Sequence, residues 1–387
     1  MSEWKEYSLK DVGKVITGKT PSKNNPEDWG VKMPFITPSD YKNYRKKAAS
    51  AERYLSDEGI NRLNNKVLPV GTTMVTCIGS DMGKVALNTL PVITNQQINS
   101  IIPNVNIADS DFLFYSLVSI YVTLRIYGGD GTAVPIVNKG DFENLEILLP
   151  PLPEQKAIAA VLSSLDDKID LLHRQNQTLE ALAETLFRQW FVEEGSMLRS
   201  ITEFVVLNPK RNLAKNSIAP YLEMANVSTV VFHPQHWFNR EFKSGSKFVN
   251  GDTLLARITP CLENGKSTFV TFLDEQQVGW GSTEFIVMRS KENLHPLFSY
   301  ILAKNKDFRD FAEGCLEGSS GRQRVNIDHL KNYELFLPDG EKLSQFNNAA
   351  ASIMPKLNSN FIQIRTLGKL RDTLLPKLMS GEVRVKI

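Results

Sequence analysis

The sequence predicts a mixed α/β protein in which two similar globular domains are joined by a pair of long antiparallel coiled-coil helices. Three observations support this prediction: an internal repeat with an offset of 188 residues, a heptad pattern in each copy, and β-rich runs mixed with short helices before each heptad pattern. We therefore expect globular domains at residues 1–150 and 195–337, and long helices at residues 151–194 and 338–387.

The repeat is clearest where each domain meets its helix. Residues 144–150 (NLEILLP) reappear as residues 332–338 (NYELFLP), and Val137-Asn138 reappears as Val325-Asn326. Between such anchors the match is poor, which indicates insertions and deletions. Two similar flanking segments around different variable regions suit a protein that makes one kind of contact twice but recognises something different each time. An old gene duplication without functional meaning is the alternative.

Residues 153–191 have the pattern of one long helix. Pro153 is tolerated in a first helical turn, and no Gly or Pro follows before Gly195. Apolar residues recur at alternating steps of four and three, as in a coiled-coil seam. At 1.5 Å per residue the helix would be roughly 58 Å long. The second copy keeps the seam, but Pro355 predicts a bend or a later start there.

Charge favours pairing of the two helices. Residues 151–194 carry four basic and eight acidic side chains, whereas residues 338–387 carry eight basic and four acidic ones. Opposite charges favour the mutual pair over self-pairing, and the polar Asn176 and Asn360 in the seams are expected to fix its register. The alternative is that each long helix packs only on its own domain. The expected residues of the helix pair and of partner contacts are Leu165, Ile169, Leu172, Asn176, Leu179, Leu357, Asn360, Ile364 and Leu367.

The domains themselves read as mixed α/β. Strands are expected within residues 67–78, 85–90 and 99–102 of the first domain and 248–258 and 285–288 of the second. Helices are expected at residues 111–127 and 297–311. Each domain ends with a Gly-rich loop, at residues 128–132 and 318–324. The second loop contains Arg322, Gln323 and Arg324, whose donors suit phosphate or base edges, although a solvated surface loop is the alternative.

Composition excludes several classes of protein. The 45 basic and 43 acidic residues nearly cancel, which argues against a polycation. No apolar run approaches 18 residues, so no membrane span is expected. The N-terminus lacks the apolar core of a signal peptide. Cys77, Cys261 and Cys315 are scattered, which argues against a disulfide framework or a zinc ribbon and for the reducing cytoplasm.

Catalytic motifs are present only as partial matches. Residues 13–20 (GKVITGKT) match the P-loop pattern, but no helical pattern follows, so nucleotide binding is not expected. Asp141 with Glu154 and Lys156 loosely matches a nuclease spacing, yet a Glu at a helix start has a structural role. His233 and His236 lack a plausible third metal ligand and are expected to be surface histidines. We expect no catalytic residues and no metal site.

Several segments resemble the type I restriction-modification specificity subunits (HsdS). Residues 148–156 (LLPPLPEQK), 158–162, 166–169 and 186–191 (LFRQWF) are similar to the family's central conserved region. Residues 18–22 and 34–36 resemble the opening of its target-recognition domains, residues 207–210 the opening of the second, and residues 374–382 (LLPKLMSGE) its closing segment. Residues 338–342 (PDGEK) depart from the family's Leu-Pro-Glu-Gln, so the start of the second helix is uncertain from sequence.

The resemblance implies a DNA-specificity subunit without catalytic activity. Each domain would read half of a bipartite, asymmetric site in double-stranded DNA, and the helices would set the spacer and dock two methylation subunits. Restriction subunits with motor activity would bind further out. S-adenosylmethionine, ATP and Mg²⁺ would be used by those partners and not by this chain, and no membrane is involved.

The candidate DNA contacts combine loop position with donor type. In the first domain they are Lys19, Thr20, Ser22, Ser80, Lys84, Thr132 and Lys139; in the second they are Lys210, Arg257, Lys266, Ser320, Arg322, Gln323 and Arg324. Two other hypotheses remain: an NTP-binding enzyme built on residues 13–20, and a coiled-coil scaffold without DNA affinity. The recognised bases and the spacer length do not follow from the sequence.

Overall fold

A computed structural model describes residues 4–129, 135–195, 197–229, 231–234, 236–319 and 321–386. The chain divides into two compact units. Unit 1 comprises Met1–Asp170 and Arg365–Ile387, and unit 2 comprises Leu171–Ile364. Each unit therefore contains one globular part together with a portion of both long helices.

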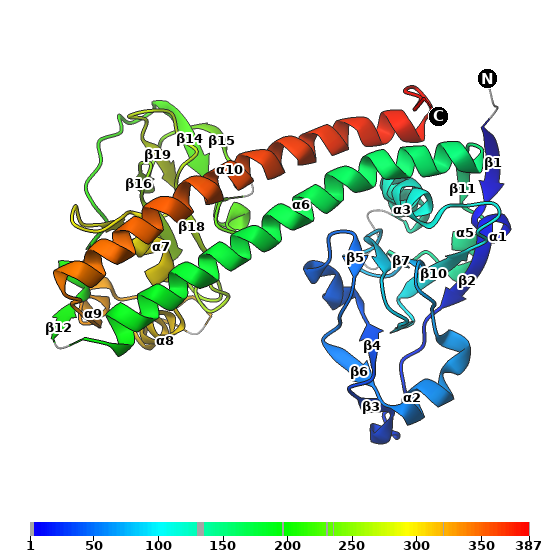
Figure 1. The fold of residues 1–387 in the computed structure, drawn as a ribbon, viewed down its shortest axis with the longest axis horizontal. Helices are drawn as coiled ribbons and strands as arrows, with labels where there is room; N and C mark the ends of the chain where they lie inside the picture. The colour runs from blue at the N-terminus through cyan, green and yellow to red at the C-terminus, as the bar shows by residue number, and fades with distance from the viewer. Residues whose placement is uncertain are drawn as a thin grey trace. The chain divides into compact units, whose positions relative to one another are not determined.

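Unit 1 contains two main sheets (Figure 1). The first has the order β2 (Gly13–Thr17), β10 (Ile98–Pro103), β7 (Thr73–Thr76), β8 (Val85–Asn88) and β5 (Lys47–Ala48). The second has the order β3 (Trp29–Gly30), β6 (Arg53–Leu55), β4 (Met33–Ile36) and β9 (Ile93–Thr94). A separate antiparallel pair, β1 (Lys5–Ser8) with β11 (Glu146–Leu149), leads into the first long helix.

Short helices complete unit 1. They are α1 (Leu9–Val12), α2 (Asp57–Arg62), α3 (Ser110–Ser119), α4 (Tyr121–Tyr127) and α5 (Lys139–Glu143), with 3-10 turns at Pro26–Asp28, Pro38–Asn43 and Asn64–Lys66. The apolar face of α3, including Phe112 and Leu113, is buried together with Ile158 and Leu162 of the first long helix and Leu378 of the second. The largest core of unit 1 thus joins the five-stranded sheet to the helices, because α3 contacts both β7 and β8.

Unit 2 repeats this plan. One sheet has the order β13 (Val205–Leu207), β20 (Phe285–Ser290), β17 (Thr253–Ala256) and β18 (Ser267–Phe269), and the other β15 (Phe238–Glu241), β14 (Ile218–Leu222), β19 (Gly279–Gly281) and β16 (Ser246–Phe248). Two antiparallel pairs are β12 (Leu198–Ser200) with β23 (Glu334–Phe336) and β21 (Leu316–Glu317) with β22 (Arg324–Val325). The helices are α7 (Leu297–Lys304), α8 (Lys306–Gly314) and α9 (Ile327–Leu330), with 3-10 turns at Ile201–Glu203 and Met224–Asn226.

The order of equivalent strands confirms that the two globular parts share one topology. The series β2-β10-β7-β8 in unit 1 corresponds to β13-β20-β17-β18 in unit 2, and all of these pairs are antiparallel. In the second sheet, β4 pairs with β9 in parallel, as β14 does with β19. The 188-residue offset is also retained where Asn138 caps α5 and Asn326 caps α9, each by accepting hydrogen bonds from backbone N–H groups.

Both long helices are present. The first, α6, spans Leu152–Phe187 and is followed by a π-helical segment at Arg188–Glu193. The second, α10, spans Gly340–Met379 and is continuous through Pro355, so the later start suggested by Pro355 is wrong. Its start is explained by Asp339, whose side chain accepts a 2.9 Å hydrogen bond from the Lys342 backbone N–H. This cap stabilises the first turn of the helix, where the segment departs from the Leu-Pro-Glu-Gln pattern.

The fold class predicted from the sequence is confirmed, with local corrections. The helix expected at residues 111–127 is interrupted at Ile120, and that expected at 297–311 is interrupted at Asn305, whose side chain caps α8. An Asn side chain competes for backbone donors, which ends one helix and begins the next. In the part of the chain that the structure describes, no helix combines the length and apolarity needed to cross a membrane.

Candidate nucleic-acid interface

The same backbone site recurs at the carboxyl end of β7 in unit 1 and of β17 in unit 2. In unit 1, the Cys77 N–H donates to Gln97 O at 2.7 Å, the Val137 N–H donates to Cys77 O at 2.8 Å, and Ile78 forms a β-bridge with Ile136. In unit 2, the equivalent bonds are Arg257 N–H to Glu284 O at 2.9 Å, Val325 N–H to Arg257 O at 2.8 Å, and the bridge of Ile258 with Arg324. We call these positions the strand-end site: Cys77, Gln97 and Ile136 in unit 1, and Arg257, Glu284 and Arg324 in unit 2.

The side chains at the two strand-end sites differ in charge. In unit 1, Cys77 is buried, and burial raises the pKa of its thiol to about 12, so the site is uncharged. The Gln97 side chain accepts a 2.9 Å hydrogen bond from Asn95. In unit 2 the equivalent positions hold two arginines and a carboxylate, and Arg324 donates to Glu284 from Nε and Nη2 at 2.8 to 3.0 Å. One backbone frame therefore carries two different surfaces.

Two hollows adjoin the strand-end site of unit 2. The first, of about 470 Å³, is lined by Arg257, Glu317, Gly318, Arg324, Val325, Asn326 and Ile327. The second, of about 420 Å³, is lined in part by Lys210, Arg211, Lys247 and Arg257. Arg257 lines both. Its Nη2 donates to Val325 O at 3.2 Å, and its Nε is buried without a hydrogen-bond partner. The basic side chains make both hollows suitable for anionic groups.

The candidate DNA residues of unit 1 are mostly on the surface, but they do not form one cluster of free donors. Lys19, Ser22 and Ser80 are exposed. Thr20 Oγ1 donates to Gln96 Oε1 at 2.7 Å, and Ser22 Oγ accepts from the Asn24 N–H. Lys84 and Lys139 form ion pairs with Asp81 and Glu143 at 2.7 and 3.2 Å. Thr132 lies outside the described residues. The assignment of these residues to DNA stays a prediction.

In unit 2 the structure brings three of the candidates together. Lys210, Arg257 and Arg324 lie at the two hollows. Arg322 is exposed, Gln323 is half-buried with its backbone bonded to Thr259, and Lys266 Nζ donates to Met224 O at 2.9 Å. Ser320 lies outside the described residues. Sequence reasoning missed Glu284, Arg211 and Lys247, because they are far from the Gly-rich loop along the chain. Aligning the two repeats at β10 and β20 would have placed Glu284 opposite Gln97.

Most of the P-loop-like segment forms strand β2, and its glycines are explained by close packing. Gly13 begins β2, which pairs with β10, and Gly18 follows the strand directly. A Cβ added to Gly13 would lie 2.3 Å from the Ile102 carbonyl oxygen, and one on Gly18 would lie 2.2 Å from the Thr94 carbonyl oxygen. Close approach of backbones therefore explains both glycines. A phosphate-binding loop before a helix is absent here, and the NTP-binding alternative has no structural support.

In unit 2, α6 and α10 pack antiparallel. Asn360 is buried and its Nδ2 donates to Asn176 Oδ1 at 2.7 Å, which is the seam pair expected from the sequence. Lys342 forms an ion pair with Glu194 at 3.3 Å. Leu172 and Leu357 are buried, whereas Leu179 and Ile364 are half-buried. The Tyr300 hydroxyl of α7 donates to Glu180 of α6 at 2.8 Å, and burial raises the pKa of that carboxyl.

In unit 1 the remaining parts of the same helices are also antiparallel, and ion pairs join them. Arg371 Nη1 lies 2.8 Å from Asp166 Oδ1, and Arg384 Nη2 lies 2.7 Å from Glu154 Oε2. Ile169 is buried, while Leu165 and Leu367 are half-buried. The acidic partners come from α6 and the basic ones from α10 or the segment after it, as the charge counts indicated.

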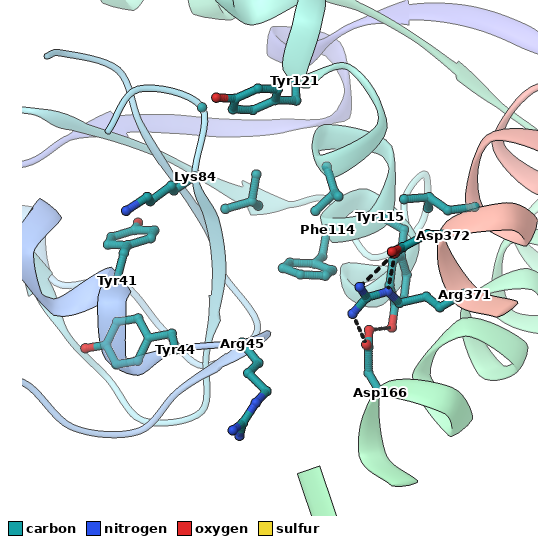
Figure 2. A pocket seen from close by; sticks show the side chains of 14 residues that line it. Tyr41, Tyr44, Arg45, Lys84, Phe114, Tyr115, Tyr121, Asp166, Arg371 and Asp372 are labelled. Carbon is teal, nitrogen blue, oxygen red and sulfur yellow. Dashed lines mark hydrogen bonds and ion pairs between the residues drawn. The ribbon is translucent and has the colours of Figure 1, made fainter. Parts of the chain in front are cut away.

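A cavity of about 480 Å³ in unit 1 connects the globular part to this helix pair (Figure 2). It is lined by aromatic rings, among them Tyr41, Tyr44, Phe114 and Tyr121, and by basic groups from Arg45, Lys84 and Arg371. Asp166 accepts from both Arg371 and the Tyr115 hydroxyl, the latter at 2.6 Å, which ties α3, α6 and α10 together (Figure 2). Because Asp166 binds Nη1 of Arg371 while Asp372 binds its Nε and Nη2, this group acts as a joint between elements.

The remaining motifs have structural roles. The nuclease-like Glu154 pairs with Arg384, and Gln155 accepts from the Asp109 N–H at 2.9 Å. The expectation of surface histidines is wrong for His233, which is 3% exposed and packs on Phe361 of α10 with ring centroids 3.9 Å apart. Burial lowers the pKa of His233 to about 3. Among the described residues, no group of three or more His, Cys, Asp or Glu side chains could hold a metal ion, and the three cysteines are free.

The chain is similar to known specificity subunits of type I restriction enzymes. Residues 1–181 match the type I restriction modification DNA specificity domain. The chain is 27% identical over 99% of its length to the type I restriction enzyme MjaIX specificity subunit of Methanocaldococcus jannaschii, of which 94% is covered. It is 23% identical, again over 99% of its length, to the HindI specificity subunit of Haemophilus influenzae, of which 100% is covered.

A solved structure has a similar fold. The S subunit of a type I restriction-modification system from M. genitalium superposes with a TM-score of 0.57 at 16% identity, covering 98% of this chain and 96% of that one. The duplicated α/β domains with their long helices are thus a known architecture. The full-length relatives are specificity subunits of type I restriction enzymes, and this chain is similar to them over 99% of its length.

Proposed function

We propose that this chain supplies DNA sequence specificity to a type I restriction-modification enzyme. Each globular domain reads one half of a bipartite, asymmetric site in double-stranded DNA, and the α6–α10 pair sets the spacer between the half-sites. One observation carries this proposal: the strand-end sites have the same backbone bonds but different side chains, Cys77, Gln97 and Ile136 against Arg257, Glu284 and Arg324. A repeated frame with different recognition groups fits two half-sites of different sequence.

The catalytic steps belong to partner subunits. The helix pair would dock methylation subunits, two per chain, and restriction subunits would bind further out. S-adenosylmethionine, ATP and Mg²⁺ would be used by those partners, and the assembly would act in the cytoplasm without a membrane. In support, the P-loop-like and nuclease-like motifs of this chain are accounted for by strand pairing and by the Glu154–Arg384 ion pair.

Mapping of methylated adenines tests the proposal. We expect a host that carries this gene together with a competent methylation subunit to methylate one bipartite motif, and the motif to vanish when only this gene is deleted. The purified complex should bind the motif in a salt-sensitive manner, because phosphate contacts release counterions. An unchanged pattern of methylation after deletion would contradict the proposal.

A further inference from the structure

The Glu284–Arg324 pair of unit 2 holds a guanidinium group at the protein surface in a fixed orientation. Arg324 Nε lies 3.0 and 2.9 Å from the two oxygens of Glu284, and its Nη2 lies 2.8 Å from Oε1. The Arg324 side chain is 48% exposed, whereas that of Glu284 is 20% exposed. The carboxylate is thus the inner partner, and the guanidinium is the group that meets solvent.

Among the described residues, no hydrogen bond occupies the outer edge of the Arg324 guanidinium. A guanidinium has five N–H donors in one plane. Glu284 occupies the side formed by Nε and Nη2, so one N–H of each Nη nitrogen remains on the outer edge as a parallel fork. Such a fork matches the two acceptors O6 and N7 that guanine presents in the major groove. Because its side chain is held before DNA arrives, Arg324 would lose less rotamer entropy on binding.

Other side chains near Arg324 are suited to the DNA backbone. Arg257 and Arg324 both line the first hollow, and Lys210, Arg211 and Lys247 join Arg257 at the second. Of the described residues that line the two hollows, only Glu317 is acidic. Phosphate groups carry no sequence information, so contacts of these cations with phosphates would position the duplex. The Arg324 guanidinium, held by Glu284, would then be available to bind a base.

We propose that Arg324, oriented by Glu284, reads a guanine in the half-site bound by unit 2. The inference rests on the proposed function and specifies the base chemistry of one of its two sites. Unit 1 has Cys77, Gln97 and Ile136 at the equivalent positions and so has no guanidinium there. Guanine recognition from the strand-end site is therefore a property of the second domain alone.

The test is selection of a randomised duplex library by the full-length chain assembled with its methylation subunit. Three forms are compared: the wild type, Arg324→Lys and the control Lys291→Ala. Lysine keeps the positive charge but lacks the planar fork, which separates base reading from phosphate binding. Lys291 is exposed in unit 2, lines neither hollow and is not a candidate DNA contact, so its loss controls for a change in surface charge. The Arg324 side chain lies outside the core, and circular dichroism checks that each variant folds.

We expect Arg324→Lys to lower discrimination in favour of one G·C pair by about 5- to 150-fold, the range of a bidentate base contact, in one half-site only. Affinity for duplexes that lack this guanine, and the salt dependence, should stay within about twofold of the wild type. An equal loss for all sequences would assign Arg324 to phosphate, and unchanged discrimination would remove it from recognition; each result overturns the inference while leaving the proposed function intact. Failure of the wild-type complex to select any bipartite motif would overturn both.

Discussion

Buried His233 is expected to make unit 2 sensitive to acid. Its ring packs between Phe232 and Phe361, and Thr271 Oγ1 is 3.1 Å from Nδ1. Among the described residues Nε2 makes no hydrogen bond of good geometry, and the nearby Asn358 side chain offsets burial only in part. The described residues show no ion pair for this side chain. A proton on the ring would therefore place an uncompensated charge between the domain and α10, which is why burial lowers the pKa of His233 to about 3.

The sign of the effect follows from the two protonation states. Unfolded His233 takes up a proton near pH 6.5, whereas the folded ring stays neutral until about pH 3. Between these values the unfolded state binds more protons, so stability is fully present above pH 6.5 and falls as the pH is lowered. At about 1.4 kcal/mol per pH unit, the loss between pH 7 and pH 5 is about 2 kcal/mol. For a unit of this size it corresponds to a fall in Tm of about 4 to 8 °C.

The assay is thermal unfolding at pH 7 and pH 5 for the wild type, His233→Phe and the exposed-residue control His236→Ala. Phenylalanine keeps a ring against Phe361 but cannot be protonated. Between pH 7 and pH 5 the Tm of His233→Phe should therefore fall about 4 to 8 °C less than the Tm of the wild type. The control should behave as the wild type does. Equal losses in the wild type and His233→Phe, or a His233 titration near pH 6.5 by NMR, would refute the reasoning.

Three further predictions concern the seam asparagines, two helix caps and the P-loop-like segment. Asn360→Leu should destabilise the chain by about 1 to 3 kcal/mol in urea unfolding, because half-buried Asn176 loses its partner, whereas adding Asn176→Leu should restore most of that loss; a double variant as unstable as the single one would contradict this. Asn138→Ala and Asn326→Ala should each cost about 1 kcal/mol, because both side chains cap short helices at equivalent places, and an unchanged midpoint for either would argue against its cap. Calorimetry should detect no ATP binding by the isolated chain, with Lys19→Ala indistinguishable from the wild type; binding that Lys19→Ala abolishes would contradict the assignment of residues 13–17 to a strand.

Much of the architecture follows from local sequence signals. The repeat at an offset of 188 residues, the heptad seams and the opposite helix charges lead to two like domains and an antiparallel helix pair, and the seam asparagines Asn176 and Asn360 do meet. Such features can be predicted from the sequence because helical periodicity and capping act between residues a few positions apart. Pro355 misled this reasoning, since the start of α10 depends on the Asp339 cap and on packing along the helix.

The sequence by itself therefore determined the duplicated plan, the two long helices and the absence of a convincing catalytic motif. Only the tertiary structure decided which side chains act together. Glu284 and Arg324 are 40 residues apart, and it is strand pairing that brings them into contact, while His233 is buried because α10 covers it. The physical reason is that recognition surfaces and buried charges arise from contacts between distant segments, which local periodicity does not encode.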